Sequence, residues 1–134
     1  MNLLVDTSAW FALNSRRDKR HRAAIEFVRQ FRLIPVIFYT TDYVVDETAT
    51  LLRMKVSHRQ AVNFLNSITR NPNVIRAQVS RDILIRAEEI FRGYSDKRWS
   101  YTDCVSFAFM DAEMLDNAFA FDHNFTQYGK IVHP

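Results

Sequence analysis

Residues 3–10 are Leu-Leu-Val-Asp-Thr-Ser-Ala-Trp, a short apolar run that ends abruptly at an acidic residue. A continuous apolar run of this length is typical of a strand that is buried on both faces. Thr7 and Ser8 follow at once and open a helical pattern. The stretch therefore predicts a buried strand that turns directly into a helix, with Asp6 at the junction.

The same alternation of short apolar runs and longer helical patterns continues to the end of the chain. Further strands are predicted at residues 36–39, 74–79 and 118–121, with a short edge strand at 131–133. Helices are predicted at residues 18–33, 42–56, 57–68, 80–93 and 101–115. Because strands alternate with helices, we expect a three-layer α/β/α fold, in which right-handed crossovers cover both faces of a mainly parallel sheet of four to five strands.

Length and composition exclude several classes of protein. The chain has 134 residues, 48% hydrophobic and 25% charged, which predicts a single domain over residues 1–134. Gly93 and Gly129 are its only glycines, so a glycine-rich phosphate loop is excluded. The single cysteine, Cys104, excludes an internal disulfide and a cysteine-based zinc site. With no signal peptide and no apolar run long enough for a membrane span, we expect a soluble, cytoplasmic protein.

Two acidic residues directly follow predicted strands. In a parallel sheet, ligands bind outside the carboxyl ends of the strands, where Asp6 and Asp122 are expected to lie. Each also has a purely structural interpretation, because Asp is common where a strand meets a turn or a helix N-terminus. Taken singly, neither residue establishes a site.

Asp103 has a stronger structural interpretation, but its position on the helix also indicates a functional role. Residues 100–103, Ser-Tyr-Thr-Asp, match a capping box at the start of an apolar helix. At 100° per residue, Asp103 shares a face with Phe107, Met110 and Met114, which is otherwise apolar and predicted to point inward. A carboxylate that opens such a face indicates a cation nearby.

Helical geometry also separates two neighbouring acids of the helix predicted at 42–56. Asp46 falls opposite the apolar stripe, together with Asp42 and Arg53, and this face is interpreted as solvated. Glu47 lies at the edge of the stripe, near the start of a helix that leaves the second strand. Its side chain is therefore expected to point toward the carboxyl edge of the sheet.

Four acids, Asp6, Glu47, Asp103 and Asp122, are thus predicted to converge on one edge of the sheet. Carboxylates about 4–6 Å apart repel each other by several kcal/mol at an effective dielectric constant near 20. A divalent cation would relieve this repulsion, and ligands that are all oxygen suit Mg²⁺ or Mn²⁺. The four histidines are scattered, and only His123 adjoins one of the acids, so a histidine-based triad is not indicated.

Four segments carry a resemblance to a known family, in the same order and spacing and over essentially the whole chain. They are residues 6–10 (Asp-Thr-Ser-Ala-Trp), 46–53 (Asp-Glu-Thr-Ala-Thr-Leu-Leu-Arg), 101–107 (Tyr-Thr-Asp-Cys-Val-Ser-Phe) and 119–125 (Phe-Ala-Phe-Asp-His-Asn-Phe). Together they resemble the PIN-domain nucleases. The short format is most similar to the VapC-type toxins of bacterial toxin–antitoxin pairs.

The resemblance implies a PIN fold and metal-dependent endonucleolytic cleavage of RNA. Carried over by residue, Asp6 and Asp103 would be the principal Mg²⁺ or Mn²⁺ ligands, while Glu47 and Asp122 would complete the acidic cluster. The neighbouring hydroxyl residues would position water or phosphate; they are Thr7, Ser8 and Thr102. A cognate antitoxin, which would insert an Arg or Lys into the acidic pocket, and a homodimer are also implied.

The mild net charge of +3 hides a segregation of charge along the chain. Residues 16–32 hold seven basic and two acidic residues, and residues 53–92 hold eight and three, whereas the remainder holds three and ten. This pattern suggests that basic helices hold an RNA backbone while the acids gather at the metal. Trp10 and Trp99 are candidates for stacking on an RNA base or for a dimer contact.

Other functions stay open at this level. A phosphotransfer domain could also use a strand-end Asp, but a haloacid-dehalogenase-like protein would need an acid where Ser8 stands. A receiver domain would need an acidic pair, and Asp6 has no acidic neighbour. A PIN-fold RNA-processing nuclease outside a toxin pair is another alternative, as is a noncatalytic RNA- or protein-binding module that retains the fold.

Overall fold

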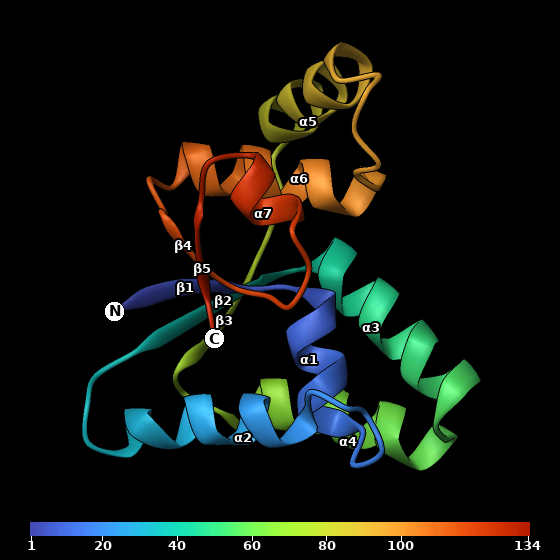
Figure 1. Ribbon diagram of the computed structural model, residues 1–134, viewed down its shortest axis with the longest axis vertical. Helices are drawn as coiled ribbons and strands as arrows, with labels where there is room; N and C mark the ends of the chain where they lie inside the picture. The colour runs from blue at the N-terminus through green and yellow to red at the C-terminus, as the bar shows by residue number, and fades with distance from the viewer.

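The computed structural model describes residues 1–134 and contains one sheet of five strands, in which all neighbouring strands run parallel. The strand order is β3-β2-β1-β4-β5, with β1 at the centre (Figure 1). The strands are β1 (Asn2–Val5), β2 (Ile37–Thr41), β3 (Val74–Ala77), β4 (Asn117–Phe119) and β5 (Ile131–His133). The predicted parallel sheet is confirmed, and it has five strands, the larger of the two numbers expected.

Helices cover both faces of the sheet, so the predicted three-layer α/β/α fold is confirmed (Figure 1). One layer contains α1 (Thr7–Asn14), α2 (His21–Arg29), α3 (Asp42–Lys55) and α4 (His58–Arg70). The opposite layer contains α5 (Arg81–Gly93), α6 (Tyr101–Ala112) and the short α7 (Asn124–Gln127). No helix is both long enough and apolar enough to cross a membrane.

The central strand β1 is buried on both of its faces, as its continuous apolar run predicts. Leu3 and Val5 belong to the core on the side of α1–α4, which is built around Phe64 and Phe119. Leu4 points the other way, into the core formed with α5 and α6. Because successive side chains of a strand alternate between faces, this four-residue strand ties the two layers together.

The helix predicted at residues 18–33 is shorter than expected at both ends. It begins at His21, and a 3₁₀ turn, η1 (Gln30–Arg32), follows α2. Asp18 accepts a hydrogen bond from the Arg20 N–H at 2.8 Å, which stabilises a turn in place of a first helical turn. The basic residues before His21 therefore lie in a loop and not on a helix face.

The helix predicted at 101–115 ends at Ala112. Met114 has a positive φ of 53°, and the Leu115 N–H donates to the Met110 carbonyl at 2.8 Å, which closes the helix. Met114 is therefore 86% exposed, and its expected place on the inward face is wrong. Phe107 and Met110 are fully buried as predicted.

The strand predicted at 118–121 also ends early, at Phe119. Beyond it, the Phe121 N–H donates to the Ser8 hydroxyl at 3.0 Å instead of to a neighbouring strand. The remaining predicted elements agree with the structure within a few residues, including the helix N-caps formed by Ser57 and Ser80.

Shortening one buried side chain on each face of β1 tests whether both faces are buried. We expect Leu3→Ala and Leu4→Ala each to lower the free energy of unfolding by about 2–5 kcal/mol, because each leaves a cavity in a different core. Leu33→Ala is the matched control, since Leu33 is 95% exposed, and it should change stability by no more than about 0.5 kcal/mol. Urea unfolding measures all three. A Leu4→Ala protein as stable as the control would contradict the packing described here.

Candidate active site

The four predicted acids lie at the carboxyl edge of the sheet, on four different elements. Asp6 directly follows β1, Asp122 lies three residues beyond β4, Glu47 is in the second turn of α3 after β2, and Asp103 is in the first turn of α6. The parallel topology brings them to one edge because every strand ends there. The convergence that the sequence predicts is therefore reproduced in three dimensions.

Burial and mutual repulsion both act on the carboxylates at this edge. Asp6 is 2% exposed, and burial, followed by repulsion from Asp122 and Asp103, raises its pKa from the ordinary 3.8 to about 8. Burial likewise raises the pKa of Asp103, with Asp122 and Glu47 adding to the rise. Each carboxylate therefore raises the cost of a negative charge on its neighbours.

Asp6 is anchored by the residue two positions further along the chain. It is the N-cap of α1, and its Oδ2 accepts hydrogen bonds from the Ser8 N–H at 3.2 Å and the Ser8 hydroxyl at 2.7 Å. The Ser8 Oγ in turn accepts the Phe121 N–H. Ser8 thus fixes the Asp6 side chain and joins the end of β1 to the segment after β4.

Asp103 combines the predicted cap with a contact that the sequence did not reveal. In the capping box, the Ser100 N–H donates to its Oδ2 at 3.0 Å, while the Ser100 hydroxyl accepts the Asp103 N–H. The Asn124 side-chain amide, from α7, donates to the same Oδ2 at 2.9 Å. The Asn124 N–H donates to the Asp122 Oδ1 at 3.0 Å. Asn124 therefore orients two of the four acids at once.

These hydrogen bonds occupy only one oxygen of each aspartate. The Oδ2 of Asp6, the Oδ2 of Asp103 and the Oδ1 of Asp122 receive every side-chain hydrogen bond made to these residues. The second oxygen of each stays available to another partner. As placed, no three Asp, Glu, His or Cys side chains form a group that could hold a metal ion by themselves. A cation at this edge would therefore also require oxygen ligands from water or substrate.

The three hydroxyl residues expected to support the site differ in their surroundings. Ser8 contacts Asp6 directly. The Thr7 hydroxyl is buried and has no hydrogen-bond partner. Thr102 is partly exposed in the first turn of α6. Only Ser8 makes a hydrogen bond to one of the acids.

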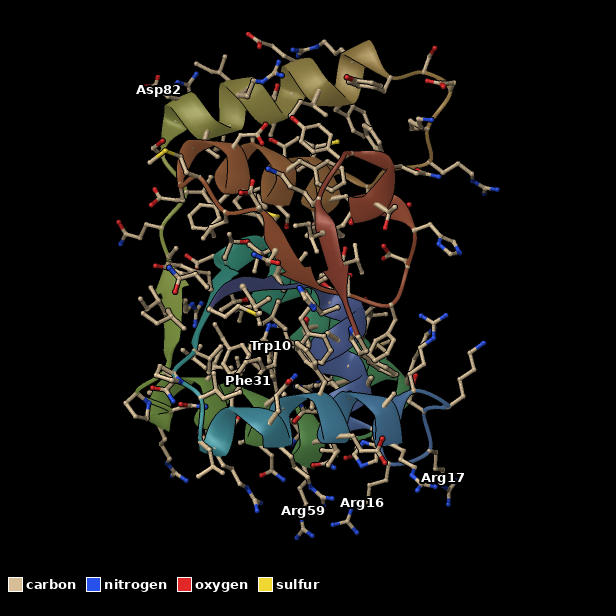
Figure 2. The ribbon with its side chains drawn as sticks, turned by 60° about the vertical axis from the view of Figure 1, so that its left-hand side comes forward. Trp10, Arg16, Arg17, Phe31, Arg59 and Asp82 are labelled. Atoms are coloured by element: carbon tan, nitrogen blue, oxygen red, sulfur yellow. The ribbon has the colours of Figure 1, made fainter.

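Both tryptophans proposed as stacking or dimer residues are buried, so that interpretation is wrong. Trp10 lies in the interior of the molecule (Figure 2). It packs tilted against Phe64, and its indole N–H donates to the Thr40 hydroxyl at 3.2 Å. The Trp99 indole N–H donates to the Gln127 side chain at 2.9 Å. Each is 7% exposed. A tryptophan in a helix or loop could fill either role, and only the tertiary packing distinguishes them.

His123 and Cys104 are two further reactive side chains that adjoin the acids in sequence. His123 is exposed next to Asp122. Cys104 is buried beside Asp103, and burial raises the pKa of its thiol to about 11, which agrees with a packing role.

One basic residue reaches this edge unexpectedly. The Arg20 guanidinium donates to the Phe121 carbonyl, and its central carbon lies 5.2 Å from the centroid of the Phe121 ring. The two residues are about one hundred positions apart, so no local pattern could have revealed their contact. The sequence placed Arg20 on a helix with the other basic residues.

Comparison with known proteins agrees with this architecture. The chain is 34% identical over 130 residues to the 23S rRNA-specific endonuclease VapC20 of Mycobacterium tuberculosis, in strains CDC 1551 / Oshkosh and ATCC 25618 / H37Rv. The match covers 96% of this chain and 95% of each relative.

Solved structures extend the comparison. The crystal structure of M. tuberculosis VapC20, described as a sarcin–ricin loop cleaving toxin, matches with a TM-score of 0.90 and 32% identity, covering 98% of this chain and 99% of that one. VapBC2 from Rickettsia felis, bound to a DNA fragment from its promoter, has a TM-score of 0.74 at 10% identity, covering 99% and 98%. FitAcB from Neisseria gonorrhoeae has a TM-score of 0.70 at 14% identity, covering 100% and 97%. The last two share the fold.

The four sequence segments, the parallel sheet and the acidic edge all agree with one family. The PIN domain family model matches residues 3–131, which is nearly the entire chain. The resemblance inferred from the sequence is thereby confirmed, and the chain belongs to the PIN-domain family.

Proposed function

We propose that this protein is an endoribonuclease that hydrolyses RNA phosphodiester bonds and serves as the toxin of a toxin–antitoxin pair. The observation that carries the proposal is the convergence of the four acids on the edge of a PIN fold. The relative named as a 23S rRNA-specific endonuclease supports it, since the similarity extends over both chains. VapC20 is described as cleaving the sarcin–ricin loop, so this loop is the first RNA to test.

The alternatives account for fewer of the observations. A noncatalytic binding module has no need for neighbouring carboxylates whose pKa values are raised by burial and, to a smaller extent, by mutual repulsion. Membership of the PIN-domain family disfavours a phosphotransfer domain. An RNA-processing nuclease outside a toxin pair would use the same site, and the similarity to VapC20 favours the toxin.

We further propose that Asp6 and Asp103 hold a divalent cation, Mg²⁺ or Mn²⁺, with Glu47 and Asp122 completing the site. The residues fit this role, because all donors are oxygen and each aspartate keeps one oxygen without a hydrogen bond. A cation would also offset the cost of burial and the repulsion from Asp122 and Asp103 that together raise the pKa of Asp6. When bound, it would activate water for attack on the phosphate and stabilise the charge that develops there.

Hydrogen bonds within the chain would hold the acids in the orientation needed to bind the cation. Ser8 holds one oxygen of Asp6, and Asn124 holds one oxygen each of Asp103 and Asp122, so the free oxygens need not reorganise when the substrate binds. The unpartnered Thr7 hydroxyl next to Asp6 suits contact with water or phosphate. Thr102 is proposed for the same role.

We propose that residues 1–134 form one nuclease domain that acts in the cytoplasm, with RNA as substrate. A toxin in its own cell needs restraint, so we also propose a cognate antitoxin and a homodimer. The fold shared with VapBC2 and FitAcB supports the comparison with toxin–antitoxin proteins.

Cleavage assays test the acidic cluster. We expect the wild-type protein to cut the isolated sarcin–ricin loop RNA or total cellular RNA with Mg²⁺ or Mn²⁺, and to stop when a chelator is added. Asp6→Asn and Asp103→Asn should each lower the rate by about 100-fold or more, since the ion supplies several kcal/mol. Gel analysis of the fragments measures the rates.

Asp46→Asn is the matched control, because Asp46 is exposed on the helix that carries Glu47. It should cleave like wild type, whereas Glu47→Gln should be impaired. Metal-dependent fragments that persist unchanged in the Asp6 and Asp103 variants would refute the assigned site.

The raised pKa of Asp6 predicts a specific pH dependence of stability. The folded chain keeps a proton on Asp6 up to about pH 8, whereas the unfolded chain releases it near 3.8. The free energy of unfolding should therefore fall as pH rises through this window. Asp6→Asn, which retains a capping side chain, should lose this part of the fall. Urea unfolding from pH 4 to 8 measures it.

Adding Mg²⁺ at pH 8 should recover stability in the wild type and less in Asp6→Asn, since the ion would bind only the folded site. Identical pH profiles for the two proteins would contradict the burial of a repelled carboxylate at Asp6.

Copurification tests the partners. We expect a tagged chain expressed in its native host to retain a small DNA-binding protein, and light scattering to give the mass of a complex built on a dimer. Asp6→Asn and Asp103→Asn should weaken antitoxin binding if its Arg or Lys enters the acidic pocket. A monomer without a partner over a wide concentration range would contradict both the antitoxin and the dimer.

A further inference from the structure

Two cavities flank the acidic edge, and a single arginine lines both of them. The first, of about 280 Å³, is lined by Thr7 and Ser8 next to Asp6 and by three cationic side chains, Lys19, Arg20 and Lys55. Asp18 is its one carboxylate. Its cations come from the loop before α2 and from the end of α3.

The second cavity, of about 520 Å³, shares Arg20 with the first. It is lined by Asp122 and Asn124 of the acidic cluster, and by Arg20, Lys97 and Arg98. Asp96 also lines it and pairs with Lys97 at 3.6 Å. Because each cavity reaches one part of the acidic edge, the cations form a track that passes beside the proposed site of cleavage.

Arg20 is held in a defined position where the two cavities meet. Its donation to the Phe121 carbonyl and its place over the Phe121 ring fix the guanidinium without neutralising it. No carboxylate lies within ion-pair distance of Arg20, Lys19, Lys55 or Arg98. These charges remain available to an anion.

Other basic residues of the same segments lie elsewhere. Arg16, Arg17 and Arg59 extend into solvent beyond α2 and α4, away from the sheet (Figure 2). Arg22 pairs with Glu26 at 3.0 Å on the exposed face of α2. The basic segments recognised in the sequence are therefore divided, and only a minority of their charges lines the edge with the acids.

We propose that these two cavities bind RNA backbone phosphates on either side of the bond to be cut, with Arg20 as the contact common to both. This inference rests on the proposed nuclease function and adds to it the path of the substrate strand. Backbone phosphates are the anions that such a track suits, since they repeat along the strand and are bound by Arg and Lys without regard to sequence. The separated cations would position the RNA, while the acids act at the bond between them.

The salt dependence of RNA binding provides the test. The probe is a fluorescein-labelled hairpin with the sarcin–ricin loop sequence of 23S rRNA, measured by anisotropy in the cleavage-impaired Asp6→Asn protein. Each phosphate contact contributes about 0.7–0.9 to the slope of log affinity against log salt concentration. We expect Arg20→Ala, Lys55→Ala and Arg98→Ala each to reduce the slope by about this amount and to weaken binding several-fold.

Lys55 and Arg98 keep the test independent of folding, because their side chains make no hydrogen bond or ion pair within the chain. In the otherwise wild-type enzyme, their removal should raise KM with little change in kcat, as expected for contacts that bind ground state and transition state alike. Arg16→Ala and Arg59→Ala are the matched controls and should keep the wild-type slope and an affinity within about twofold.

Each result bears on the proposal. Wild-type slopes for Lys55→Ala and Arg98→Ala, or equal losses in Arg16→Ala and Arg59→Ala, would overturn the path. A loss confined to one cavity would overturn its two-sided form. Failure of the nuclease function is distinguishable, since the wild-type enzyme would then cleave neither the hairpin nor total RNA. Normal cleavage with unaltered slopes would remove this inference alone.

Discussion

The burial of β1 on both faces is the constraint on which the acidic edge of the sheet depends. Helices cover the strand on both faces, so its end carries Asp6 into a region from which water is largely excluded. Burial in this region, with added repulsion from Asp122 and Asp103, raises the pKa of Asp6 to about 8. The fold tolerates this repulsion at the one edge where parallel strands all end, because that edge collects side chains from distant parts of the chain.

The structural and functional interpretations of the acids are compatible. Asp6 caps α1, and Asp103 belongs to a capping box, as local sequence patterns predict. A cap occupies one carboxylate oxygen, and in both residues the same oxygen also accepts the second hydrogen bond. The helix starts thus hold the acids in place while leaving an oxygen for a ligand. Capping therefore orients the site and does not compete with it.

The positions of the charged side chains matter more in this protein than its net charge. The basic segments account for the positive charge of the sequence, yet Arg16, Arg17 and Arg59 project into solvent away from the sheet (Figure 2). Lys19 and Arg20 are the exceptions within residues 16–32, because the loop before α2 lines the cavity next to Asp6 and Arg20 contacts the segment after β4. Anion-binding and cation-binding groups can therefore lie side by side without neutralising one another, which is what the handling of a phosphodiester requires.

The sequence by itself determined the α/β class, the order of the elements and the placement of four acids at the carboxyl edge of the sheet. Burial on two faces, helical periodicity and carboxylates at strand ends are all local patterns. It also indicated the family, through segments that keep their order and spacing. Only the tertiary structure decided that Trp10 and Trp99 are buried, that Asn124 orients two acids and that Arg20 reaches the edge. These outcomes depend on contacts between residues far apart in the chain, which no local pattern records.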